Sequence, residues 1–91
     1  KIADERNRMI KELNKIAYIK VYNSQANYIM CELKQITSDD LAIKLLDKYN
    51  ILIKSLTGKH GFENKQMIRI AVKNVKENNQ LINALMEIGN L

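Results

Sequence analysis

The sequence predicts an α/β fold of the α+β type, with helices packed on one face of a small mixed sheet. Segments with apolar residues every three or four positions, typical of helices, alternate with short segments rich in Ile, Val and Tyr, typical of strands. Hydrophobic residues make up 46% of the chain, an ordinary fraction for a globular protein. We therefore expect residues 1–91 to form a single domain with the element order α-β-β-α-β-β-α.

One helix and two strands are predicted in the N-terminal third. Residues 2–16 carry a helical apolar stripe, with acids in the first turn and lysines in the last, which suits the helix dipole. Residues 18–22 and 26–33 alternate between apolar and polar residues and are predicted as strands. Asn23 and Ser24 are typical of a turn or kink, which we expect between these strands.

The second helix is predicted to begin near Ser38, which has an N-cap side chain and is followed by two acids. Asn50 can end this helix because asparagine tolerates the left-handed conformation. Residues 51–54 are too few for a helix and are predicted as a strand.

The C-terminal third begins with a polar loop over residues 55–66, a length often associated with function. Residues 67–72 are predicted as a strand. Asn74 and Glu77 have the spacing of a capping box at the start of a last helix, which Gly89 is expected to end.

A strand-helix-strand unit normally crosses over right-handed between parallel strands. Strand 67–72 is then predicted to lie antiparallel between strands 26–33 and 51–54, in a split βαβ arrangement. Helices would cover one face of this sheet and leave the other open. The chain starts without Met and within a predicted helix, so we expect it to be one domain of a longer protein.

Composition limits the classes of function. The net charge of +5 would suit an acidic partner, but the 15 basic residues are spread along the chain rather than gathered in a stripe. A basic βαβ-type module for nucleic acid or another anion is therefore an alternative, as is a regulatory domain that binds an amino acid at a sheet edge. The single cysteine suits a cytoplasmic protein, and no apolar run reaches the about 20 residues of a membrane span.

Arg69 is the main candidate functional residue, because it lies between two isoleucines in the strand 67–72. Alternation places it on the opposite face from these isoleucines, together with Met67 and Ala71, and the small Ala71 leaves room for a ligand. A guanidinium binds a carboxylate or phosphate through two parallel hydrogen bonds. Two other interpretations have similar weight: a surface arginine on an open sheet face, or an arginine paired with Glu32.

Asn27, Cys31 and His60 are three further residues of types that occur in functional sites. Asn27 lies in a predicted strand, where asparagine is depleted, so it either bonds a turn or faces a site. Cys31 is expected to pack in the core. His60 has no Cys or Asp at metal-ligand spacing and is expected to be a solvated loop residue, so no metal site and no catalytic set is predicted.

Several segments, taken together and in order, resemble the C-terminal small domain of fold-type I pyridoxal-phosphate enzymes. The resemblance is greatest to the branch of histidinol-phosphate aminotransferases and threonine-phosphate decarboxylases. Similar tails occur in chains that join a nucleotidyltransferase domain to an aminotransferase-like domain. The segments are 5–13, 21–29, 51–55, 68–72 and 77–85.

The resemblance implies a role for two cations. In this family the arginine of the Ile-Arg-Ile strand binds the substrate α-carboxylate, and Arg69 matches that position. A second arginine often ends the preceding strand, and here that position is Lys54, which keeps the charge but loses the forked geometry. Residues 1–16 would be the helix that links the small domain to the large one.

The resemblance also implies what lies elsewhere. The Schiff-base lysine motif belongs to the large domain and is not found in these 91 residues, so pyridoxal 5'-phosphate would be bound by the full-length protein and not by this chain alone. The implied partners are the large domain of the same polypeptide, a small amino-acid substrate and a second copy in a homodimer, without nucleic acid or membrane. The implied activity is amino-group transfer, with decarboxylation of a phosphorylated amino acid as the alternative.

Overall fold

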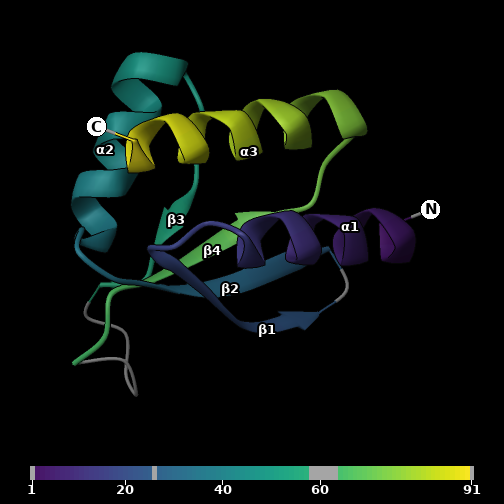
Figure 1. Ribbon diagram of the computed structural model, residues 1–91, viewed down its shortest axis with the longest axis horizontal. Coiled ribbons are helices and arrows are strands. Elements are labelled where there is room, and N and C mark those ends of the chain that lie inside the picture. The colour runs from purple at the N-terminus through teal and green to yellow at the C-terminus, as the bar shows by residue number, and fades with distance from the viewer. Residues whose placement is uncertain (1, 26, 58–63, 91) are drawn as a thin grey trace.

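Helices and strands follow one another in the predicted order α-β-β-α-β-β-α (Figure 1). The computed structural model describes residues 2–25, 27–57 and 64–90, and every structural statement below refers to these residues. The elements are α1 (Ile2–Asn14), β1 (Ile19–Gln25), β2 (Tyr28–Leu33), α2 (Ser38–Tyr49), β3 (Lys54–Ser55), β4 (Met67–Ala71) and α3 (Val75–Gly89).

The four strands form one sheet in the order β1-β2-β4-β3. Each neighbouring pair is antiparallel, so β2 and β3 run parallel to each other on either side of β4. This confirms the split βαβ arrangement and the central place of the strand that carries Arg69. In the ladder, Arg69 pairs with Met30 of β2 on one side and with Lys54 of β3 on the other.

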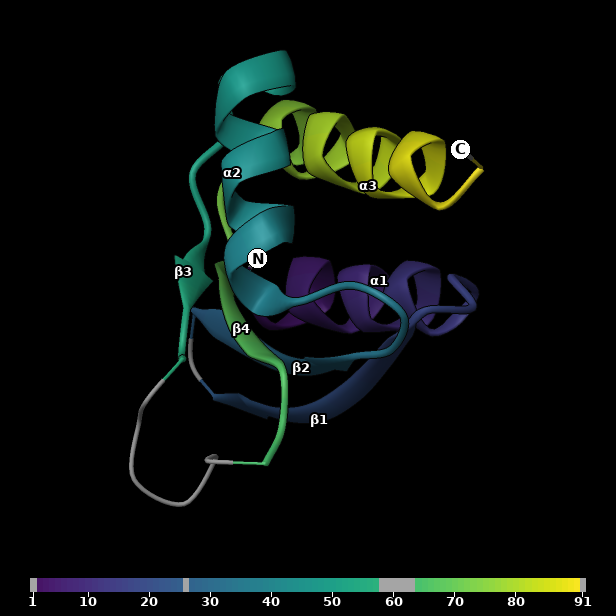
Figure 2. The same cartoon turned by 90° about the vertical axis from the view of Figure 1, so that its left-hand side faces the viewer.

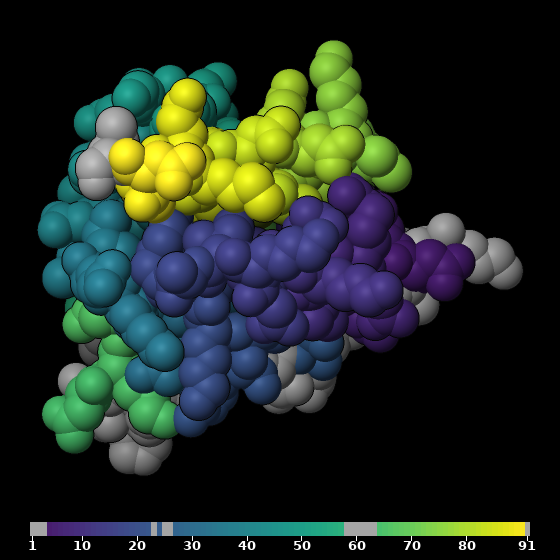
Figure 3. Space-filling view, in the orientation of Figure 1, coloured from purple at the N-terminus to yellow at the C-terminus, as the bar shows by residue number. Residues whose placement is uncertain are grey.

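The three helices lie on the same face of the sheet, with α1 nearest to the strands and α3 above it (Figure 2). Seen from the helix side, α1 and α3 lie side by side across the molecule (Figure 3). The core forms where their apolar stripes meet alternate residues of β2 and β4. Its fully buried members include Met9, Leu13, Ile29, Ile68 and Leu85.

The N-terminal elements differ slightly from their predicted bounds. Helix α1 ends at Asn14 rather than at residue 16. Asn23 and Ser24 do not form a turn between strands, because β1 continues through them to Gln25. Their ladder with β2 shifts register between Val21 and Asn23, so the predicted kink takes the form of a β-bulge within one strand.

The predicted cap of α2 was wrong by one residue. The N-cap is Thr37, whose hydroxyl accepts a bond from the Asp40 backbone N–H at 3.1 Å. Ser38 is instead fully buried. At the other end Asn50 has φ 57°, which confirms the predicted left-handed stop.

Strand β3 is shorter than the predicted 51–54. The backbone N–H of Ile51 bonds the carbonyl of Leu45, 3.0 Å away, and so completes the end of α2 instead of a sheet ladder. Only Lys54 and Ser55 pair with β4 as a strand. The predicted N-cap of α3 is confirmed, since the Asn74 side chain accepts a bond from the Glu77 N–H at 2.8 Å; the reciprocal bond of a full capping box, from the Asn74 N–H to the Glu77 side chain, is not found among the described residues.

A buried asparagine that the sequence did not reveal links α1 to the start of α3. Asn78 is 2% exposed, and its amide bonds the Lys73 backbone in both directions, at 2.9 and 3.0 Å. It also donates to the Glu5 carboxylate at 2.8 Å, which Arg8 holds from its other side at 2.6 and 2.9 Å. The chain leaving β4 is therefore tied both to α3 and to α1.

The Glu5 carboxylate gives the fold a pH dependence. Its hydrogen bonds lower its pKa from 4.5 to about 2, and the bond with Arg8 has a larger effect than the bond with Asn78. A depressed folded-state pKa adds stability above pH 4.5, and this stability is lost as the pH falls towards 2. We expect Glu5→Gln to remove this component and to lower the free energy of unfolding at pH 7 by about 1 kcal/mol.

Urea unfolding at pH 7 and pH 3 measures this effect. The matched control is Glu12→Gln, which removes an exposed pair with Lys15 on the same helix and should change stability little. If the Glu5→Gln chain loses as much stability between pH 7 and pH 3 as the unmodified chain does, the account of Glu5 is wrong.

Candidate functional site

Arg69 is exposed and alternates with the core residues Ile68 and Ile70, so its side chain lies on the face of the sheet opposite the helices. Arg69 and Lys54 are directly opposite each other in the β3–β4 ladder, and both side chains are exposed. Residues opposed in this way have Cβ atoms about 4.5–5.5 Å apart, and like charges at that separation repel each other. An anion bound between the two cations would relieve this repulsion, so the pair is suited to a carboxylate or phosphate.

Tyr28 orients the arginine. The Arg69 guanidinium carbon lies 5.3 Å from the centre of the Tyr28 ring, a cation–π distance. The expected alternative of pairing with Glu32 is not found: Glu32 is opposite Met67 in the ladder, and in the described part of the chain no ion pair includes Arg69. The hydrogen-bond donors of the Arg69 guanidinium are therefore available to a ligand, and the contact with the Tyr28 ring limits the movement of the arginine side chain.

Of the two residues expected beside Arg69 on the open face, Ala71 is exposed and Met67 is not. Ala71 is exposed beside Arg69, as expected. Met67 was expected on the same open face but is fully buried. The Met67 backbone carbonyl accepts a hydrogen bond from the Leu56 N–H at 2.9 Å, so the residue that follows β3 is still paired with β4 at this position. The open part of the face therefore begins at Arg69.

Asn27 lies at the end of β2 that pairs with Ala71. It is exposed and immediately precedes β2, whose first residue Tyr28 is opposite Ala71. Its backbone carbonyl accepts a bond from Val72 N–H at 2.7 Å. The structure thus gives Asn27 a backbone role in closing the end of the ladder and leaves its side chain exposed.

Further cations surround Tyr22 on β1. The ammonium nitrogens of Lys20 and Lys65 lie 5.7 and 4.6 Å from the centre of its ring, and Lys65 also donates a hydrogen bond to its hydroxyl. This hydrogen bond is the main reason that the pKa of Lys65 is raised. Positive charge is therefore present at the β1 edge of the sheet as well as at Arg69.

Cys31 is a core residue, as predicted. It is fully buried within the hydrophobic cluster, and burial raises the pKa of its thiol to about 12. A thiol with so high a pKa supplies almost no thiolate near neutral pH, so nucleophilic chemistry is not supported.

The described residues hold no metal-binding group and no membrane-spanning helix. These residues contain no group of three or more His, Cys, Asp and Glu side chains that could hold a metal ion. None of their helices is both long and apolar enough to cross a membrane. His60, expected to be a solvated loop residue, lies outside the described residues.

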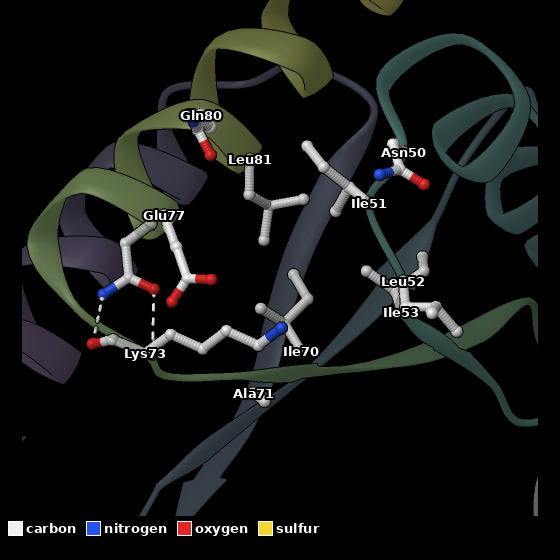
Figure 4. A pocket seen from close by; sticks show the side chains of 11 residues that line it. Asn50, Ile51, Leu52, Ile53, Ile70, Ala71, Lys73, Glu77, Gln80 and Leu81 are labelled. Atoms are coloured by element: carbon white, nitrogen blue, oxygen red, sulfur yellow. Dashed lines mark hydrogen bonds between the residues drawn. The ribbon is translucent and has the colours of Figure 1, made fainter.

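A cavity of about 160 Å³ lies between the start of α3 and the segment that leads into β3 (Figure 4). Apolar side chains such as Ile51 and Leu81 line its interior, and the extended Lys73 side chain and the Glu77 carboxylate lie along one side of it. It is smaller than the about 300–1,000 Å³ of small-molecule sites, and Arg69 does not line it. The open sheet face, which carries Arg69, is therefore a better candidate site than this cavity.

The described residues do not fit a covalent pyridoxal-phosphate site. Such a site needs an enclosed lysine, whose amine loses its proton more easily when desolvated. The described lysines are exposed, apart from Lys65, which is half-buried beside Tyr22. No lysine that the structure describes is enclosed in this way, so no reaction step is assigned to one.

The family model for aminotransferase class I and II matches residues 1–85. The histidinol-phosphate aminotransferase of Caldanaerobacter subterraneus is 39% identical over 96% of this chain and 23% of its own length. The L-serine phosphate decarboxylase of Campylobacter jejuni is 32% identical over 92% of this chain and 22% of its own length.

A solved structure agrees. The histidinol-phosphate aminotransferase of Clostridium acetobutylicum superposes with a TM-score of 0.89 and 36% identity, over 98% of this chain and 26% of that one. The chain thus spans about a quarter of the length of the relatives it matches. Enzymes of this family depend on pyridoxal phosphate. On this evidence the chain belongs to the family of class I and II aminotransferases.

Proposed function

We propose that this chain is the C-terminal small domain of a pyridoxal-phosphate-dependent aminotransferase, in which it binds the substrate α-carboxylate. The observation that carries the proposal is Arg69: an exposed guanidinium on the central strand, opposite Lys54, held by the Tyr28 ring and free of any carboxylate in the described residues. A forked cation in a rigid strand holds a carboxylate in a fixed orientation.

The rest of the site is proposed to lie in a large domain of the same polypeptide. That domain would bind the cofactor, facing the open side of the sheet, and α1 would link the two domains. Closure of the small domain over the substrate would exclude water and bring the carboxylate contact into place. Lys54 adds a second positive charge beside Arg69, and Asn27, which immediately precedes Tyr28, is a weaker candidate.

Decarboxylation of a phosphorylated amino acid is the second candidate function. It is favoured by the similarity to the L-serine phosphate decarboxylase and by the two adjacent cations, which could hold two anionic groups. Both activities need the same carboxylate contact, so the geometry of this domain serves either reaction.

The reaction is tested with the complete enzyme, an α-amino acid and a 2-oxo acid acceptor. Formation of a new amino acid without release of carbon dioxide supports amino-group transfer. Carbon dioxide release from a phosphorylated amino acid supports the second candidate. Failure to convert any amino acid, with the cofactor bound, would contradict both.

A further inference from the structure

We infer that a cluster of hydroxyl groups built around the buried Ser38, behind β3, positions Lys54 for anion binding. The cluster, here called the hydroxyl cluster, consists of Ser38, Ser55 and Thr57 together with Asp39 and Gln66. It joins the start of α2 to β3 and to the residue that precedes β4. Its proposed role rests on the proposed function, because Lys54 is assigned there to the substrate site.

Ser55 is the member of the cluster next to Lys54. Its hydroxyl oxygen lies 2.9 Å from the hydroxyl oxygens of both Ser38 and Thr57. It also donates a hydrogen bond to a carboxylate oxygen of Asp39, 2.7 Å away. One short side chain therefore contacts three partners, two of them at the N-terminus of α2.

Ser38 is the buried centre of the cluster. It is fully buried, and its hydroxyl lies 2.7 Å from that of Thr57. Its backbone N–H donates to the Gln66 side chain at 2.9 Å, and the Gln66 carbonyl in turn accepts a bond from Leu33 of β2 at 2.7 Å. The cluster is thus anchored to the sheet as well as to the helix.

Lys54 depends on this anchor because β3 is so short. It consists of two residues at the edge of the sheet and pairs with β4 through Lys54–Arg69 and Ser55–Ile68. Successive strand residues point to opposite faces, so fixing the Ser55 side chain on the helix side fixes Lys54 on the open side. Ser55 is therefore a positioning residue that acts through Lys54.

The test measures KM and kcat for the amino-acid substrate in the complete holoenzyme. Lys54→Ala is expected to raise KM about tenfold, the loss of one charge-assisted contact. Ser55→Ala should raise KM about three- to fivefold with little change in kcat. Ser55→Thr, which keeps the hydroxyl and suits a strand, should restore most of the binding. In the Lys54→Ala background, Ser55→Ala should have no further effect on KM.

Thr37→Ala is the matched control, since it weakens the start of α2 by removing its N-cap but leaves the hydroxyl cluster intact. It should leave KM unchanged. The inference is overturned if Thr37→Ala raises KM as Ser55→Ala does, if the Ser55→Ala effect persists without Lys54, or if Ser55→Ala leaves KM unaltered while Lys54→Ala raises it. An Arg69→Ala enzyme with normal KM would instead contradict the proposed function itself.

Discussion

Replacing Arg69 with alanine in the complete enzyme is expected to raise KM for the amino-acid substrate about 100-fold. Two parallel hydrogen bonds from a guanidinium to a carboxylate would be lost, and bonds to charged groups contribute about 1.5–3 kcal/mol, of which each 1.4 kcal/mol corresponds to a factor of ten. Arg69→Lys keeps the charge but not the fork, so its KM should lie between those of the two enzymes.

Lys76→Ala is the control for this prediction, because it removes an exposed cation from α3, on the helix side of the sheet. Its KM should be that of the unmodified enzyme. The absorbance of the bound cofactor should be the same in every variant, since Arg69 is proposed to contact the substrate alone. A normal KM for Arg69→Ala would rule out the carboxylate contact, whatever reaction the enzyme catalyses.

Replacing Asn78 with alanine is expected to destabilise the chain by about 3 kcal/mol. It removes three hydrogen bonds, two with the Lys73 backbone and one with Glu5, and each contributes about 1 kcal/mol. For a chain of this size the loss corresponds to a fall in Tm of roughly 12–24 °C. Thermal and urea unfolding of the 91-residue chain measure it.

The neighbouring Asn79 gives a matched control, since it is exposed on the same helix. Asn79→Ala should leave stability unchanged or raise it slightly, because alanine is the better helix former. Loss of stability in Asn78→Ala no greater than in Asn79→Ala would mean that the buried amide does not hold the junction of β4 and α3.

The sequence predicts the elements and their topology well where local rules decide the structure. The N-cap at Asn74 and the left-handed Asn50 are set by a few neighbouring residues, and both are found. The place of β4 in the sheet follows from the crossover rule and the lengths of the connections. The alternation of β2 gave the correct buried face.

The errors arise where tertiary contacts decide. Serine is the somewhat better N-cap by residue type, but Ser38 is buried and bonded to Thr57 and Gln66, and Thr37 caps the helix instead. Met67 follows the alternation of β4 and so lies on the open face, yet it is fully buried, which alternation alone does not predict. In the same way Asn78 has no local sign of burial, because its partner Glu5 is distant in sequence.

The candidate site was predicted in part. Arg69 could be singled out from the sequence because a cation interrupts an apolar strand, and the resemblance to pyridoxal-phosphate enzymes added Lys54. That these two cations are opposite each other depends on the strand register, which a sequence does not fix. The contact of Arg69 with Tyr28 depends on the same register. In the sequence pattern Tyr28 shares a strand face with Met30, and this is the only indication in the sequence of where the Tyr28 ring lies.

The most direct test of the central claim is a crystal structure of the complete enzyme with an amino-acid substrate bound. The account predicts that both α-carboxylate oxygens lie about 2.7–2.9 Å from guanidinium nitrogens of Arg69, the distance of charge-assisted hydrogen bonds. It also predicts that the open face of the sheet faces the bound cofactor. A carboxylate held by other residues, with Arg69 directed to bulk solvent, would contradict the account.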